Sequence, residues 1–129
     1  KQVADQAVKT FNIKPARPDQ LVINLSGGNQ QKVVLGKWLE RELTLLMVDE
    51  PTAGVDVGAK DEIYHLIHQL VQTGSAVLLV SSDLNELLKL SNRILVLRGG
   101  YIIRELPGGS VNEEQILTIA SGLGEEEMR

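Results

Sequence analysis

A chain of 129 residues with 43% hydrophobic residues is long enough to fold around one core, and this composition argues against disorder. The formal net charge of −4 disfavours a nucleic-acid-binding surface, and the absence of cysteine excludes disulfides and thiolate metal sites. No apolar run approaches the ~20 residues that a membrane-spanning helix needs.

The first segment has the periodicity of a helix. Apolar residues recur at helical spacing at Val3, Ala4, Ala7, Val8 and Phe11. The pattern ends at Pro15 and Pro18, and Ser26 is a good N-cap for a second helix to about Glu42. The chain starts with Lys1 rather than Met, within the first helical pattern, which indicates a fragment of a longer protein.

The middle of the chain alternates strands and a helix. The continuous apolar runs Leu43–Val48 and Ala76–Val80 are typical of strands buried on both faces, as in a parallel sheet. Between them, the spacing predicts a helix from about Ala59 to Gln72 with one apolar stripe.

The last third of the chain predicts a short helix, a hairpin and a final helix. Asp83 and Glu86 form a capping-box pattern for a helix that ends near Leu90. Ile94–Leu97 and Tyr101–Ile103 flank an Arg-Gly-Gly turn, which indicates a β-hairpin.

The final helix is predicted from its own N-terminal signal. Asn112 and Gln115 cap it, and the acidic end Glu125–Glu127 is expected to fray. The alternation of strands and helices along the chain predicts an α/β fold.

One candidate site is Asp49-Glu50, which follows an apolar strand. Carboxylates at the carboxyl end of a parallel strand lie where open α/β folds bind ligands. Asp49 is suited to hold Mg²⁺ on nucleotide phosphates, and Glu50 to polarise an attacking water. On their own, the two acids are equally consistent with an exposed turn before Pro51.

The second candidate site is the run Leu25-Ser26-Gly27-Gly28-Asn29-Gln30-Gln31. Glycines at a helix N-terminus let backbone N–H groups approach an anion, and the helix dipole adds attraction. On its own, Ser-Gly-Gly favours an ordinary N-cap with flexible glycines, because this run is common in loops.

Together the two segments, with 18 residues between Gln31 and Glu50, resemble the ABC ATPases from about Leu21 to Glu105. Leu25–Gln31 is similar to the signature motif and Leu45–Asp49 to the Walker B strand. Ala53–Asp56 is similar to the D-loop. The sequences Gly-Gly-Asn-Gln-Gln-Lys-Val at 27–33 and Gly-Val-Asp-Val-Gly-Ala-Lys at 54–60 resemble the second ATPase domain of bacterial simple-sugar importers.

The resemblance implies a division of roles among the site residues. Glu50 would be the catalytic carboxylate, Asp49 would bind Mg²⁺ through the nucleotide, and Asp56 would contact a partner domain. The residues implied at a partner's ATP are Ser26, Gly27, Gly28, Asn29 and Gln30.

Two features depart from the general family pattern. Ser82 stands where most ABC ATPases have a switch histidine, as in the sugar-importer second domains, and serine cannot supply the charge of an imidazole. The chain also has no G-x-x-x-x-G-K-[ST] phosphate loop (Walker A). The resemblance therefore implies an ATPase in the intact protein and an inactive isolated chain.

The fold that the resemblance implies is the RecA-like P-loop NTPase sheet with helices on both faces, incomplete without the Walker A segment. Residues 1–30 would end the helical signature subdomain, 31–106 would form the C-terminal part of the ATPase core, and 107–129 a C-terminal helix and acidic tail. In this fold the phosphate-loop strand lies between the strands that match Ala76–Val80 and Ile94–Leu97. Its absence would leave unpaired sheet edges, which predicts a dimer or a rearranged sheet. A monodisperse monomer in light scattering would contradict that prediction.

The implied partners are a second ABC ATPase domain placed head to tail, membrane-spanning permease subunits and, indirectly, a sugar-binding protein, without nucleic acid. The implied location is peripheral, at the cytoplasmic face of the inner membrane. Two other functions stay open: a degenerate half-domain that completes a partner's ATP site, and an ABC-type ATPase of DNA maintenance.

Lys32 and Lys37 are expected on a solvated helix face.

Overall fold

The computed structural model describes residues 2–39 and 41–123, which form two compact units divided between Val80 and Ser81. Each unit is described by itself. The predicted fraying of Glu125–Glu127 lies outside the described residues.

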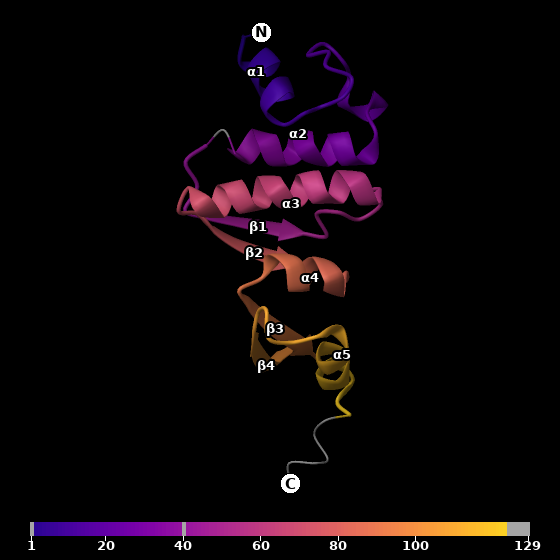
Figure 1. Ribbon diagram of the computed structural model, residues 1–129, viewed down its shortest axis with the longest axis vertical. Helices are drawn as coiled ribbons and strands as arrows, with labels where there is room; N and C mark the ends of the chain where they lie inside the picture. Colours follow the sequence, from indigo (N-terminus) through magenta and orange to yellow (C-terminus); the bar gives the residue numbers. More distant parts are fainter. Residues whose placement is uncertain (1, 40, 124–129) are drawn as a thin grey trace. The chain divides into compact units, whose positions relative to one another are not determined.

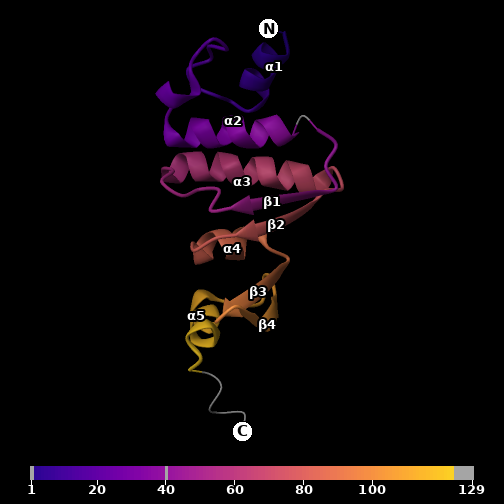
Figure 2. The ribbon, with the colours of Figure 1, turned by 180° about the vertical axis from the view of Figure 1, so that it is seen from behind.

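In its described residues, the first unit contains three α-helices, one 3-10 turn and two strands. In chain order these are α1 (Gln2–Thr10), η1 (Val22–Asn24), α2 (Gly27–Leu39), β1 (Leu45–Asp49), α3 (Val57–Gln72) and β2 (Ala76–Val80). Figures 1 and 2 show α3 lying along the strand pair and α2 on the far side of α3. The unit is therefore layered, with α2 outside α3 and α3 on the sheet.

The two strands of this unit are parallel, as the apolar runs predicted. Leu45 pairs with Ala76 and Asp49 with Val80, so β1, α3 and β2 form a strand–helix–strand unit. Among the described residues, β2 pairs with β1 alone.

The prediction that both strand faces are buried is wrong in this structure. Leu46 is buried, whereas the side chains of Leu45 and Met47 are 51% and 68% exposed. Leu78 and Val80 on β2 are also exposed. Successive strand residues point to opposite faces, and α3 covers one face only.

The core of the first unit is aliphatic apart from one phenylalanine and one tyrosine. One cluster joins Phe11, Ile13, Leu25 and Leu66, which come from the loops around α1 and α2 and from α3. The stripe predicted on α3 is buried at four of its five positions: Ile63, Leu66, Ile67 and Leu70 are each at most 5% exposed. The fifth position, Val71, is 43% exposed. Ile63 is the fully buried member of this stripe.

The second unit consists of α4 (Leu84–Leu90), β3 (Arg93–Arg98), β4 (Tyr101–Pro107) and α5 (Glu113–Ser121). The predicted hairpin is confirmed: β3 and β4 are antiparallel and join through a two-residue turn. Ile94, Val96 and Ile116 form its buried cluster.

Both predicted N-caps of this unit are confirmed. The Asp83 side chain accepts a hydrogen bond from the backbone N–H of Glu86 at 3.2 Å. Asn112 and Gln115 form a full capping box, with distances of 2.9 and 3.0 Å. Such caps satisfy backbone donors that the first helical turn leaves open.

Candidate functional site

The segments predicted to act on nucleotide gather at one end of the first unit. The N-termini of α2 and α3 lie at the same end as the carboxyl end of β1 (Figures 1 and 2). This end therefore carries the signature segment (Leu25–Gln31), the Asp49-Glu50 pair and the D-loop segment (Ala53–Asp56). Open α/β folds bind ligands at the carboxyl ends of their parallel strands.

The start of α2 is organised by Ser26 and Asn29. The Ser26 Oγ accepts hydrogen bonds from the backbone N–H of Asn29 at 3.5 Å and from its Nδ2 at 2.8 Å, so the predicted N-cap is confirmed. The Asn29 Oδ1 accepts from the backbone N–H of Lys14 at 2.9 Å. Asn29 thus ties the signature segment to the loop after α1.

The side chain of Gln30 is also engaged within the chain. Its Nε2 donates to the carbonyl of Leu25 at 3.0 Å and to that of Ile23 at 3.5 Å. Both side chains thus hold the turn before α2 through hydrogen bonds within the chain. Nucleotide binding by Asn29 or Gln30 stays a prediction.

The two signature glycines lie against the D-loop and the start of α3. A Cβ on Gly27 would lie 3.4 Å from the carbonyl oxygen of Gly54, and one on Gly28 would lie 2.5 Å from the Cβ of Ala59. Gly27 is exposed and Gly28 is buried. The backbone of the exposed turn is accessible to an anion, while its inner side is packed.

Glu50 occupies a backbone conformation that is uncommon for its residue type. Its φ is +47°, in the left-handed region, where a side chain costs energy that the surroundings must offset. Its N–H donates to the carbonyl of Val80 at 2.8 Å, and its carbonyl accepts from the N–H of Ala53 at 3.1 Å. These bonds fix the direction in which the residue leaves β1.

Asp49 fits the role of a Mg²⁺–nucleotide ligand. Its carboxylate is exposed at the end of β1, and carboxylate oxygen is the donor type that Mg²⁺ prefers. Among the described residues, no three His, Asp or Glu side chains cluster so as to hold a metal by themselves. Mg²⁺ at ATPase sites takes one or two carboxylates together with phosphate oxygens, which this arrangement allows.

The D-loop aspartate has a structural role within the chain. The Asp56 Oδ1 accepts a hydrogen bond from the backbone N–H of Ala59 at 3.0 Å, so Asp56 is the N-cap of α3. Its contact with a partner domain stays a prediction.

Ser82 belongs to the second unit and is exposed. It lies in the turn before α4, where the Ser81 Oγ accepts from the backbone N–H of Asp83 at 3.0 Å. Its role at a nucleotide stays a prediction.

The prediction of a solvated face for Lys32 is wrong. Lys32 is 4% exposed, its Nζ donates to the carbonyl of Asn12 at 3.0 Å, and it forms an ion pair with Glu62. Burial lowers the pKa of Lys32, the charge of Lys14 lowers it further, and Asp56 acts in the opposite direction. The position of Lys32 midway between Gly28 and Gly36 was the available signal, since residues four apart share a helix face.

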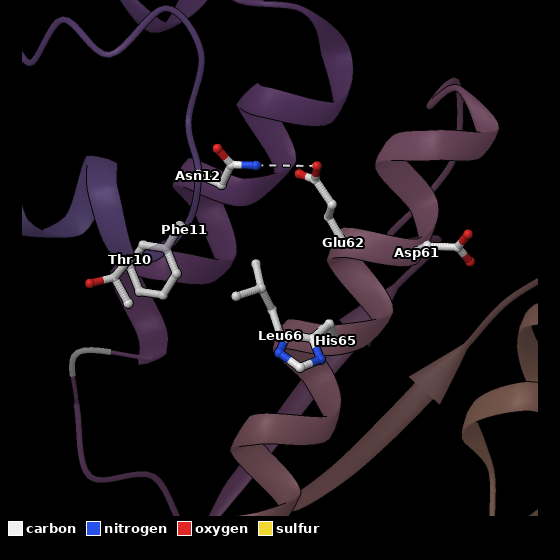
Figure 3. A pocket seen from close by; sticks show the side chains of 7 residues that line it. All are labelled: Thr10, Phe11, Asn12, Asp61, Glu62, His65 and Leu66. Atoms are coloured by element: carbon white, nitrogen blue, oxygen red, sulfur yellow. Dashed lines mark hydrogen bonds between the residues drawn. The ribbon is translucent and has the colours of Figure 1, made fainter.

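Glu62, the ion-pair partner of Lys32, also lines a pocket of about 360 Å³ (Figure 3). Its lining comes from the end of α1, the loop after it and α3: Thr10, Phe11, Asn12, Asp61, Glu62, His65 and Leu66. The Asn12 amide donates to the Glu62 Oε1 at 3.3 Å across its upper wall. The wall is thus built from groups that already bind one another.

Comparison with known proteins connects these segments to one family. A family model described as ABC transporter matches residues 1–53. The arabinose import ATP-binding protein AraG of Pectobacterium atrosepticum is 50% identical over 117 residues, which cover 91% of this chain and 23% of that protein. The chain thus spans less than a quarter of the length of this curated relative.

Solved structures agree with this relationship. An ATP-binding cassette of an ABC transporter in its ADP conformation has a TM-score of 0.71 and 26% identity, over 93% of this chain and 45% of that one. The dimeric structure of a bacterial ABC transporter cassette has a TM-score of 0.71 and 24% identity, over 85% of this chain and 47% of that one. These similarities confirm the α/β fold class and the resemblance stated from the motifs. The chain belongs to the ATP-binding proteins of ABC transporters, and among them it is homologous to the ATPases of sugar importers.

Proposed function

We propose that this chain provides the signature motif, the Walker B carboxylates and the D-loop of an ATP-hydrolysing subunit that drives sugar import. The observation that carries the proposal is the gathering of these three segments at one end of the first unit (Figure 1). The name of the arabinose-import relative supports a sugar as the cargo class.

At the chain's own site, Asp49 would hold Mg²⁺ and Glu50 would orient and polarise the attacking water. Mg²⁺ supplies charge neutralisation on the β- and γ-phosphates when it is bound. The fixed backbone of Glu50 directs its carboxylate from the end of β1, and the exposed Asp49 offers an oxygen ligand next to it. The phosphate loop itself would come from sequence outside residues 1–129.

In a head-to-tail pair, the signature segment would bind the γ-phosphate of a partner's ATP. Ser26 and the exposed backbone of Gly27 lie at the N-terminus of the 13-residue helix α2, where backbone N–H groups and the helix dipole favour an anion. The dimeric state of a solved cassette with this fold supports such a pair.

The remaining partners would be permease subunits in the inner membrane and, through them, a sugar-binding protein. The subunit would lie peripherally at the cytoplasmic face. In the part of the chain that the structure describes, no helix has the length and apolar character to cross a bilayer.

In this scheme residues 1–30 end the helical subdomain, 31–106 complete the ATPase core and 107–129 form a C-terminal extension.

A second candidate function is supported by Ser82. A serine in place of the switch histidine fits a half-domain that no longer hydrolyses its own ATP and only completes the site of its partner. The two functions differ in whether Glu50 is needed for turnover.

Calorimetric titration of Mg-ATP tests the proposal that residues 1–129 supply only part of the ATP site. The complete subunit that carries residues 1–129 is expected to bind ATP, and residues 1–129 alone are expected not to bind it, because the phosphate loop supplies the cradle for the β- and γ-phosphates. Circular dichroism of the shorter chain provides the control for folding.

Either opposite result contradicts the proposal. A complete subunit that does not bind ATP would remove the ATPase assignment. Binding by the folded 129-residue chain would show that these residues contain a phosphate cradle of their own.

A further inference from the structure

Helix α2 presents a stripe of three buried residues, Gly28, Lys32 and Gly36. They are four residues apart and therefore lie on one face of the helix. Two are glycines and the third is a charged residue, which is an unusual composition for the inner face of a helix. Each of the three meets a different neighbour.

The stripe makes contacts at three levels, one for each residue. At the first level, that of Gly28, helices α2 and α3 approach each other closely. A Cβ on Gly28 would lie 2.5 Å from the Cβ of Ala59 and 3.3 Å from the Cγ1 of Val55. Because Asp56 caps α3 at the N–H of Ala59, the contact joins the signature turn to the first turn of α3. A methyl group at Gly28 would force the two helix ends apart.

The second level is the ion pair one turn further along both helices. Lys32 on α2 contacts the Glu62 carboxylate on α3, and the Lys32 Nζ also donates to the Asn12 carbonyl at 3.0 Å. Asn12 in turn donates to the other Glu62 oxygen at 3.3 Å, as Figure 3 shows. A charge that is 4% exposed is therefore held by partners from two other segments.

The third level is the packing of Gly36 on the loop after α1. A Cβ there would lie 2.5 Å from the Cδ2 and 2.7 Å from the Cε2 of Phe11. The side chain of Phe11 occupies the space that glycine leaves open, and it belongs to the buried cluster with Leu25.

From these contacts we propose that the Gly28–Lys32–Gly36 stripe sets the position of the signature turn relative to the D-loop, with Lys32 as a positioning residue. Glycine is required at position 28 because Ala59 lies against it, in addition to any contact with phosphate. This inference rests on the proposed ATP site.

Moving one methyl group from position 59 on α3 to position 28 on α2 tests the Gly28–Ala59 contact in the complete subunit. Gly28→Ala is expected to raise the half-saturating ATP concentration about tenfold, which is within the range of coupling between residues in contact. Adding Ala59→Gly is expected to restore it to within about threefold, because the exchange conserves the packed volume. Ala59→Gly alone is expected to lower the melting temperature by a few degrees and leave the ATP response intact.

The second level, the Lys32–Glu62 ion pair, is tested by removing the charge of Lys32. Lys32→Met is expected to raise the half-saturating ATP concentration while the maximal rate stays near that of the wild type, and Lys32→Arg is expected to retain function. Lys37→Met is the matched control on the same helix, since Lys37 is exposed and stacks over Trp38.

The outcomes separate this inference from the proposed function. A wild-type subunit that does not bind ATP would overturn the proposed function, and this inference with it. A wild-type subunit that binds ATP, together with a Gly28→Ala/Ala59→Gly variant that folds but is as impaired as Gly28→Ala, would overturn this inference alone. Equal effects of Lys32→Met and Lys37→Met would overturn the role of Lys32.

Discussion

Glu50→Gln in the complete subunit is expected to lower ATP turnover by on the order of a hundredfold or more and to leave ATP binding in place. A positioned general base contributes about 10²–10⁴-fold to rate, and glutamine keeps the shape of the side chain without its basicity. Both residues would have to adopt the left-handed backbone at φ +47°, so the change isolates the carboxylate from the backbone conformation. Steady-state hydrolysis and calorimetric binding of ATP are the two measurements.

Glu42→Gln is the control, because Glu42 is exposed in the loop before β1 and lies outside the proposed site. Unchanged turnover in Glu50→Gln would favour the second function, in which this domain completes a partner's site. Loss of binding as well as turnover would show that Glu50 has a structural role at the end of β1.

Ile63→Ala is expected to lower the free energy of unfolding of the first unit by about 2–5 kcal/mol. Ile63 is the fully buried member of the α3 stripe, and its truncation removes apolar contacts and leaves a cavity. Urea denaturation of the purified chain, followed by circular dichroism, measures the change.

Val71→Ala on the same helix is the control, since Val71 is 43% exposed. Its loss is expected to stay below about 1 kcal/mol, because a half-exposed side chain loses little packing on truncation. Equal losses for the two variants would mean that α3 does not pack through the stripe that contains Ile63.

The sequence predicted the helices, the strands and the motifs because these depend on local signals. The capping box of Asn112 and Gln115, the hairpin turn and the apolar stripe of α3 each arise from residues a few positions apart. The spacing of the signature and Walker B segments is likewise a property of the chain alone. Their gathering at one end of the unit also depends on the packing of the start of α2 on the start of α3, where Gly28 lies against Ala59.

Other properties depend on contacts between residues distant in sequence, and only the tertiary structure decided them. Lys32 appears solvated when it is considered with its neighbours in sequence, but Glu62, 30 positions later, and the Asn12 carbonyl, 20 positions earlier, allow it to be buried. The exposure of one face of β1 depends on which face α3 covers, and continuous apolar runs do not encode that choice.

The sequence by itself determined the family motifs, the α/β alternation and the helix caps, because each is a pattern of residue types along the chain. The tertiary structure decided that Gly28 packs on Ala59, that Lys32 pairs with Glu62 and that Glu50 is held in a left-handed conformation. The reason is that close approach, desolvation and backbone strain are set by which surfaces meet when the chain is folded.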